Sequence, residues 1–277
     1  MIDLSLDQVV HEYAGGVRAL DGLNLRIGAG EAVALVGQNG SGKTTLVRHL
    51  NGLLRPTAGK VLVGDRDAAE LRVAALARQV GLVFQDPDRQ IFAGTVRREV
   101  EFGPRNVGLR GPGLDDAVSA ALSAVGLEGE QATNPYDLGA ARRKLLAIAS
   151  VLAMQTPVLV LDEPTTGQDR AGVALVQGLV SDVVGTGRTV IAVSHDLRFV
   201  AETFPRVVVL RAGRVVLDSS PKEVFAPPNR ETLASTGLEP PWAAQLAGRL
   251  GLGPVATEAE LVAAVARAGA GAGAGAG

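Results

Sequence analysis

Gly37-Gln38-Asn39-Gly40-Ser41-Gly42-Lys43-Thr44 is the stretch that decides the fold. It fits the pattern G-x-x-x-x-G-K-[ST], with an apolar strand expected over 32–36 before it and a helix expected over 43–54 after it. The glycines let the backbone curl so that successive N–H groups point at phosphate oxygens, and the helix N-terminus adds partial positive charge. Lys43 is expected to reach the β- and γ-phosphates, and Thr44 to ligate Mg²⁺. The expected nucleotide contacts are Gly37, Asn39, Gly40, Ser41, Gly42, Lys43, Thr44 and Thr45.

A second nucleotide-binding element follows a short apolar strand expected over 158–161. Two carboxylates, Asp162 and Glu163, come directly after this strand, at the sheet edge where open α/β sheets bind ligands. Asp162 suits Mg²⁺, either through water or through Thr44. Glu163 is then placed to polarise the water that attacks the nucleotide, which makes it the candidate general base.

The order of elements predicts an α/β fold with a mostly parallel sheet covered on both faces. Apolar strands alternate with amphipathic helices, the pattern of such sheets, and the first thirty residues read as short strands joined by glycine-rich turns. Prolines and helices over 86–156 interrupt this alternation and indicate a helical insertion. The expected organisation is a domain over 1–220, a small helical extension over 221–267, and a disordered Ala-Gly tail over 268–277.

Composition narrows the classes of function. The formal net charge is −2, from 27 basic and 29 acidic residues, so nothing draws the chain to nucleic acid. The absence of cysteine excludes a disulfide framework and a thiolate metal site. No apolar run approaches the length of a membrane helix, and the first residues do not resemble a signal peptide. We therefore expect a water-soluble chain, which can still sit on a membrane partner.

Together these motifs resemble the ATP-binding subunits of ABC transporters over about residues 1–220. Gln85 follows an apolar strand where that family has its Q-loop glutamine, and His195 ends a strand at the family's switch histidine. Tyr13 precedes a glycine-rich turn where the family stacks an aromatic ring on adenine. The resemblance implies a P-loop NTPase of the ABC-cassette type, with an N-terminal antiparallel subdomain, that hydrolyses ATP with Mg²⁺ as a dimer. It gives Gln85 a Mg²⁺ or water contact and His195 the γ-phosphate contact.

A narrower resemblance covers residues 84–109, with Phe84-Gln85-Asp86-Pro87-Asp88-Arg89-Gln90-Ile91-Phe92 at its start. This stretch is similar to the ATPases of energy-coupling-factor importers, which move vitamins and cobalt or nickel ions. The resemblance implies that about residues 86–104 face a membrane subunit, that the chain lies on the cytoplasmic face of the cell membrane, and that the C-terminal extension helps two ATPases pair. A solvated amphipathic stretch is the alternative for 86–104.

One motif departs from the family pattern. The family signature Leu-Ser-Gly-Gly-Gln, which completes the ATP site of the other ATPase in a dimer, corresponds here to Leu138-Gly139-Ala140-Ala141-Arg142. Gly139 has no hydroxyl, Ala140 and Ala141 add methyl groups, and Arg142 offers a charged substitute donor. A heterodimer with a second ATPase of ordinary signature is favoured over a homodimer. Two alternatives to a transport ATPase remain: a soluble non-transport ABC ATPase, and a regulatory subunit that hydrolyses ATP weakly.

Overall fold

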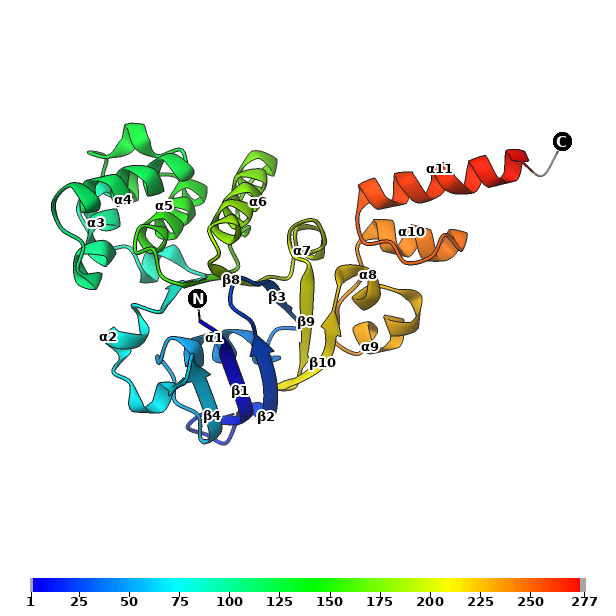
Figure 1. Cartoon of the computed structure of the whole chain (residues 1–277), viewed down its shortest axis with the longest axis horizontal. Coiled ribbons are helices and arrows are strands. Elements are labelled where there is room, and N and C mark those ends of the chain that lie inside the picture. The colour runs from blue at the N-terminus through cyan, green and yellow to red at the C-terminus, as the bar shows by residue number, and fades with distance from the viewer. Residues whose placement is uncertain (1, 275–277) are drawn as a thin grey trace.

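A six-stranded sheet forms the centre of the molecule (Figure 1). The computed structural model describes residues 2–274, with side-chain burial given as far as residue 269. Five strands of the central sheet run parallel, and β10 pairs antiparallel with β9 at one edge, which confirms the predicted mostly parallel sheet. The strand order is β10 (Arg214–Ser219), β9 (Arg206–Arg211), β3 (Ala32–Val36), β8 (Thr189–Val193), β7 (Val158–Asp162) and β6 (Val80–Val83).

The N-terminal strands form a separate antiparallel sheet, as the resemblance implied. Its order is β2 (Arg18–Ile27), β1 (Leu4–Glu12), β4 (Ala58–Val63) and β5 (Arg66–Asp67). The apolar side chains of this sheet pack against one face of the central sheet and against helix α1 (Lys43–Leu50). Helix α1 is shorter than the expected 43–54, because Gly52 adopts a left-handed conformation with φ +76° that cannot continue the helix.

The central strand β3 explains why the sheet strands are wholly apolar. Val33 and Leu35 point into the core shared with the antiparallel sheet, while Ala34 and Val36 point into the core shared with the helices. Because alternate residues of a strand face opposite sides, burial on both faces requires every residue to be apolar. Helices α6 (Arg170–Gly185) and α7 (Leu197–Thr203) supply apolar side chains to this second core.

The predicted helical insertion is a group of helices at one end of the sheet, drawn in green in Figure 1. It contains α3 (Val96–Val107), α4 (Gly111–Ala124) and α5 (Ala140–Leu152), which contact one another, and α2 (Val73–Leu76) precedes it. Helix α5 also contacts β6 and β7, so it joins the insertion to the central sheet.

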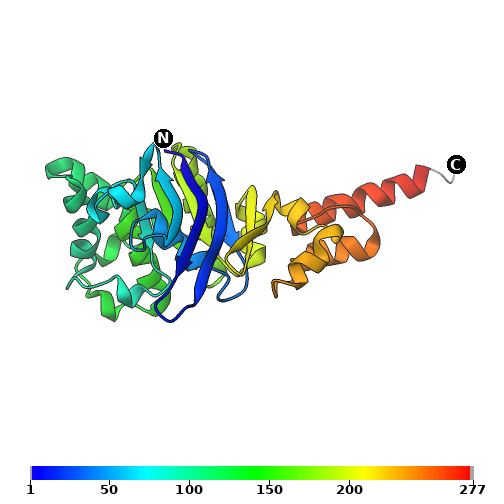
Figure 2. The ribbon, with the colours of Figure 1, turned by 90° about the horizontal axis from the view of Figure 1, so that it is seen from below.

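The described part of the C-terminal extension holds four α-helices: α8 (Pro221–Val224), α9 (Arg230–Ala234), α10 (Trp242–Leu250) and α11 (Glu258–Ala274). Figure 2 shows α10 and α11 reaching out to one side of the rest of the molecule. A capping box starts α11, since Glu260 N–H donates to Thr257 Oγ1 at 3.3 Å and Thr257 N–H donates to Glu260 Oε2 at 3.3 Å.

The sequence predicts a disordered tail over 268–277, and helix α11 extends into this segment as far as Ala274. Each glycine in a helix costs about 1 kcal/mol relative to alanine, but alternation with alanine, the best helix former, extends a helix that is already capped and packed. Residues 275–277 of that prediction lie outside the described part of the chain. Within residues 2–274, none of the helices has both the length and the apolar composition needed to cross a membrane.

Candidate nucleotide-binding site

The phosphate loop connects β3 to α1, and two of its glycines are required by close backbone approach. A Cβ on Gly37 would lie 2.3 Å from the Leu210 carbonyl oxygen, and one on Gly42 would lie 2.6 Å from the Ala19 carbonyl oxygen. Both residues also have positive φ, +150° and +106°. No side chain caps the first turn of α1. The loop therefore presents the unpaired N–H groups of a helix start, which is an anion-binding geometry.

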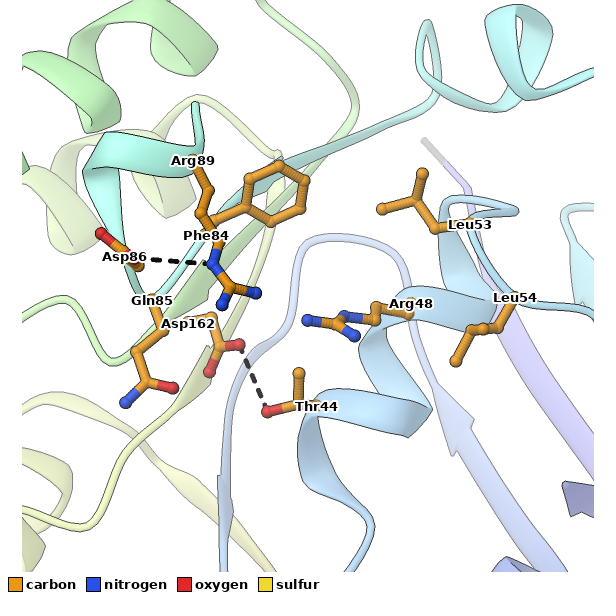
Figure 3. A pocket seen from close by; sticks show the side chains of 9 residues that line it. All are labelled: Thr44, Arg48, Leu53, Leu54, Phe84, Gln85, Asp86, Arg89 and Asp162. Atoms are coloured by element: carbon orange, nitrogen blue, oxygen red, sulfur yellow. Dashed lines mark hydrogen bonds and ion pairs between the residues drawn. The ribbon is translucent and has the colours of Figure 1, made fainter. Parts of the chain in front are cut away.

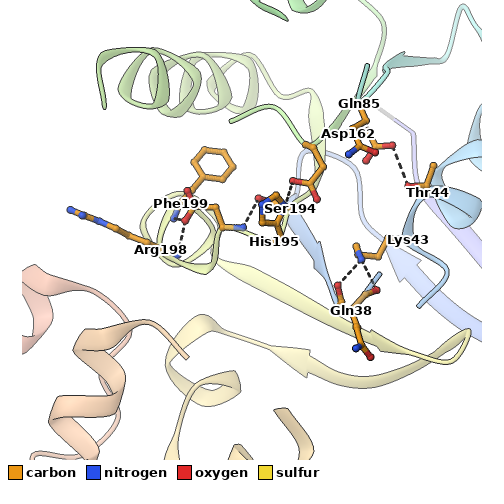
Figure 4. A network of polar contacts seen from close by, with 12 residues as sticks. Gln38, Lys43, Thr44, Gln85, Asp162, Ser194, His195, Arg198 and Phe199 are labelled. Carbon is orange, nitrogen blue, oxygen red and sulfur yellow. Dashed lines mark hydrogen bonds and ion pairs between the residues drawn. The ribbon is translucent and has the colours of Figure 1, made fainter. Parts of the chain in front are cut away.

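The Lys43 side chain points back to the start of this loop, next to Gln38 (Figure 4). Its ammonium group donates to the carbonyl oxygens of Gly37 at 2.6 Å and of Gln38 at 3.0 Å, and the side chain is buried. Burial lowers the pKa of Lys43, while the negative charges of Glu163 and Asp162 oppose that shift. The loop, the lysine and the two carboxylates thus form one electrostatic unit at the carboxyl end of the sheet.

Thr44 and Asp162 meet across the end of the sheet. Thr44 Oγ1 donates to Asp162 Oδ2 at 3.3 Å, and Gln85 lines the same cleft, of about 400 Å³ (Figure 3). Asp162 is 3% exposed, and its Oδ1 is buried without a hydrogen-bond partner among the described residues. Burial, and then the charge of Glu163, raises the pKa of Asp162. A buried, unpartnered carboxylate oxygen beside a threonine hydroxyl fits Mg²⁺, which prefers hard oxygen ligands.

Glu163 and His195 form the next part of the site. His195 Nδ1 lies 2.8 Å from Glu163 Oε2, with Glu163 buried and the His195 side chain 68% exposed. Glu163 has φ +52°, an uncommon conformation for a residue with a side chain. Its backbone N–H donates to the Val193 carbonyl at 2.9 Å, which anchors this turn to β8. Such backbone strain is concentrated at functional sites.

Most of the residues expected to bind the nucleotide line one cleft of about 270 Å³. Gly37, Ser41 and His195 do not line it: the first two shape the loop, and His195 reaches it through Glu163. Sequence reasoning missed Val17, Arg18 and Ala19, for which the glycine-rich turn after Tyr13 was the available signal. The residues of the sequence prediction that line the cleft are Tyr13, Asn39, Gly40, Gly42, Lys43, Thr44, Thr45, Gln85, Asp162 and Glu163.

Tyr13 reaches the cleft from the antiparallel sheet. Its hydroxyl lies 3.0 Å from Thr45 Oγ1, and the residue is 37% exposed. Its ring also meets the buried His11 in an edge-to-face contact, with centroids 4.6 Å apart. Tyr13 is therefore held at the mouth of the cleft, where part of its ring is open to a planar group.

The altered signature lies at the start of α5. Gly139 is the N-cap residue in an extended conformation, and no side chain caps the helix. The guanidinium of Arg142 pairs with Glu130 at 2.8 Å, within its own helical insertion. Ala141 is tied to the segment after Glu163, because Gln168 Nε2 donates to the Ala141 carbonyl at 2.9 Å. Arg142 is thus engaged with Glu130, although the sequence suggested it as a substitute donor.

Comparison with known proteins agrees with this geometry. Residues 20–166 match the family described as "ABC transporter". The energy-coupling factor transporter ATP-binding protein EcfA of Methanocaldococcus jannaschii is 41% identical over 236 residues, which are 84% of each chain. The structure of cbiO1 from Clostridium perfringens, titled as part of the ABC transporter complex cbiONQ, has 35% identity and a TM-score of 0.74, covering 88% of this chain and 97% of that one.

A dimeric ATP-binding cassette with ADP and phosphate bound is also similar, with 26% identity and a TM-score of 0.73 over 78% of this chain and 98% of that one. The chain spans 39% and 42% of the length of two further relatives, both putative ABC transporter ATP-binding proteins. The chain therefore belongs to the ABC transporter family, and its class is the ATP-binding cassette, the ATPase module of that family. Among its relatives, the energy-coupling-factor ATPases match over most of the length of both chains.

Proposed function

We propose that this chain binds and hydrolyses ATP to power a membrane importer of the energy-coupling-factor type, which takes up a vitamin or a transition-metal ion. The observation that carries the proposal is the cleft in which the phosphate loop, Gln85, Asp162 and Glu163 converge beside Tyr13. The likeness to EcfA and to cbiO1 supports the transporter type. The alternatives are a soluble ABC ATPase and a weakly hydrolysing regulatory subunit, and the altered signature favours the second of these.

Each residue of the cleft has a role in this proposal. Tyr13 stacks on the adenine, and the loop N–H groups with Lys43 hold the β- and γ-phosphates. Thr44, Gln85 and Asp162 hold Mg²⁺, which when bound neutralises charge on the phosphates. The support for this ligand set is the unpartnered Asp162 oxygen and its contact with Thr44.

Hydrolysis follows from the last pair of residues. Glu163 accepts the proton of a water that attacks the γ-phosphorus, and its buried carboxylate is restrained by the β8 contact. His195, 2.8 Å from the Glu163 carboxylate, orients that carboxylate and contacts the γ-phosphate. The reaction consumes ATP and water and releases ADP and phosphate.

The partner in this proposal is a second ATPase with an ordinary signature, and a heterodimer is favoured over a homodimer. In such a pair, the phosphate loop of this chain meets the partner's signature, while residues 138–142 of this chain meet the partner's phosphate loop. The competent site is then the one that uses this chain's Lys43 and Glu163. The C-terminal extension contributes to the pairing, since Trp242, Leu246 and Leu250 leave an exposed apolar stripe along α10.

A second surface is suited to a membrane subunit. A cleft of about 520 Å³ opens beside Phe92 and Phe102, which are 60% and 49% exposed and lie edge-on with centroids 4.7 Å apart. The buried carboxylate of Glu99 holds this segment in shape by accepting from the N–H groups of Phe92 and Ala93 at 3.0 and 2.8 Å. We propose that about residues 86–104 dock an apolar helix end of the membrane subunit, which places the chain peripherally on the cytoplasmic face of the membrane.

The function is tested with the full chain and with the reconstituted transporter. The expected result is that the chain binds ATP and that vesicles containing the complex take up substrate only with hydrolysable ATP. Phe92→Glu combined with Phe102→Ala is expected to abolish copurification with the membrane subunits and leave the ATP dissociation constant of the isolated chain unchanged, because both side chains line the cleft of about 520 Å³ and not the nucleotide cleft. Arg66→Glu, an exposed charge reversal on β5, is the matched control. Copurification that survives the double change would show that the docking surface lies elsewhere.

A further inference from the structure

A buried lysine that no motif identified lies at the junction of the helical insertion and the central sheet. Lys144, on the first part of α5, is 3% exposed. Its ammonium group donates to the carbonyl oxygens of Gln85 at 2.7 Å, Phe84 at 3.0 Å and Asp162 at 3.0 Å. An ammonium group has three donors, so all three are used, and each goes to backbone at the metal side of the cleft.

The position of these carbonyls within the sheet gives the contacts their meaning. The pairing of β6 with β7 ends at Val83 opposite Leu161. Phe84 and Gln85 follow β6, whereas Asp162, the last residue of β7, pairs with Val193 of β8. The two strands are therefore no longer paired with each other beyond Val83 and Leu161, and the Lys144 ammonium group contacts the backbone of both segments.

A charged group is costly at such a place. Burial of an ammonium is unfavourable unless it is fully hydrogen-bonded, and here three backbone carbonyls meet its three donors. An apolar side chain would leave these carbonyls without that donor, so the cation also contributes to local stability. What the cation adds is a fixed separation between the segment that carries Gln85 and the strand end that carries Asp162.

We propose that Lys144 is a positioning residue that ties helix α5 to the Q-loop backbone and to the end of β7, and so holds Gln85 and Asp162 together on the metal side of the nucleotide. This inference rests on the proposed function, because it concerns the same ATP site. It adds a connection between that site and the altered signature, since Lys144 lies on the helix that begins at Gly139.

The experiment compares Lys144→Met, which keeps the length and loses the donors, with Lys144→Arg, which keeps donors. Thr156→Val is the control, because it removes a buried hydroxyl at the opposite end of β7. For Lys144→Met, the Mg²⁺ concentration that gives half-maximal turnover is expected to rise by about 10–100-fold, the usual cost of losing a residue that supports a metal ligand. The ATP dissociation constant in EDTA is expected to stay close to that of the control, and the chain is expected to stay folded with a modestly lower melting temperature, because three carbonyls lose a donor. Lys144→Arg is expected to recover most of the Mg²⁺ response.

Two results would overturn the inference alone. The first is a wild-type Mg²⁺ response in Lys144→Met. The second is a large fall in melting temperature together with weaker ATP binding in EDTA in both Lys144 variants, which would mark a purely structural role. A wild-type chain that does not bind ATP at all would instead refute the proposed function, and the inference with it. The measurement on wild type therefore separates the two failures.

Discussion

Replacement of Glu163 by glutamine isolates the proposed chemical step from nucleotide binding. Glutamine keeps the shape of the side chain beside His195 but cannot accept the proton of the attacking water. The charge of Glu163 raises the pKa of Asp162, so its removal leaves Asp162 more readily ionised. It also removes a buried negative charge from the cleft in which we propose that the γ-phosphate binds. We therefore expect Glu163→Gln to bind ATP at least as tightly as wild type.

The expected loss of turnover is about 10²–10⁴-fold, the usual contribution of a positioned general base. This corresponds to about 3–5 kcal/mol in activation free energy. The geometry supports a large value, because Glu163 is 7% exposed and its backbone is anchored to Val193 at 2.9 Å, so no neighbouring carboxylate can take its place without a shift of the strand end.

The assay is steady-state phosphate release by the purified complex, together with the ATP dissociation constant and size-exclusion chromatography with ATP. Glu163→Gln is expected to release phosphate slowly and to accumulate as a closed ATP-bound dimer. Glu202→Gln, a surface glutamate on α7 that pairs with Arg198, is the control and is expected to retain wild-type turnover. Turnover of Glu163→Gln within about threefold of wild type would refute the assignment of the base.

Three further predictions follow from other parts of the molecule. Burial lowers the pKa of His49, so the unfolded chain takes up a proton below about pH 6.5 before the folded chain does. Urea titrations should therefore show the free energy of unfolding decreasing as the pH is lowered in that range, and less steeply in His49→Asn. Restoring the ordinary signature over 139–142 should raise the ATP hydrolysis rate of the slower of two unequal sites by up to about 10²–10³-fold. Lys43→Ala should lower the rate of phosphate release more than the matching lysine change in the partner does. Equal losses from the two changes would contradict unequal sites. Tyr13→Ala should weaken ATP binding by about 1–3 kcal/mol in calorimetry, while Tyr13→Phe, which keeps the stacking face, should stay near wild type.

Much of the site was predictable because its residues occupy fixed places relative to strands. The phosphate loop follows β3 and the Asp162-Glu163 pair follows β7, and in a parallel sheet those strand ends meet at one edge. The convergence of Lys43 with both carboxylates follows from that rule without any knowledge of side-chain contacts. The residues from 17 to 19 come from the other sheet, and their approach depends on how the two sheets pack, which no local pattern encodes.

The features that the sequence did not predict have local physical causes. Lys144 is one of three consecutive basic residues at the start of a helix, and only the depth of the α5 contact with the sheet distinguishes it from the exposed Arg142 and the half-buried Arg143. Low complexity suggests disorder for the Ala-Gly segment, whereas a capped helix that already packs on α10 can be continued by alanine. The end of α1 depended on a single left-handed glycine, Gly52, and helix boundaries are the least certain feature of a sequence pattern.

The altered signature and the full set of expected catalytic residues are both explained by a dimer with two unequal ATP sites. The start of α5 keeps its unpaired N–H groups, so residues 139–142 can still approach an anion. The hydroxyl donor of an ordinary signature is absent, and the guanidinium of Arg142 is paired with Glu130 at 2.8 Å. A Cβ on Gly139 would meet no atom within 4 Å, so space within the chain does not account for the glycine. In the proposed pair, we therefore expect the altered motif to weaken the site that the partner's phosphate loop forms, and we expect the site that uses Lys43 and Glu163 of this chain to be the competent one.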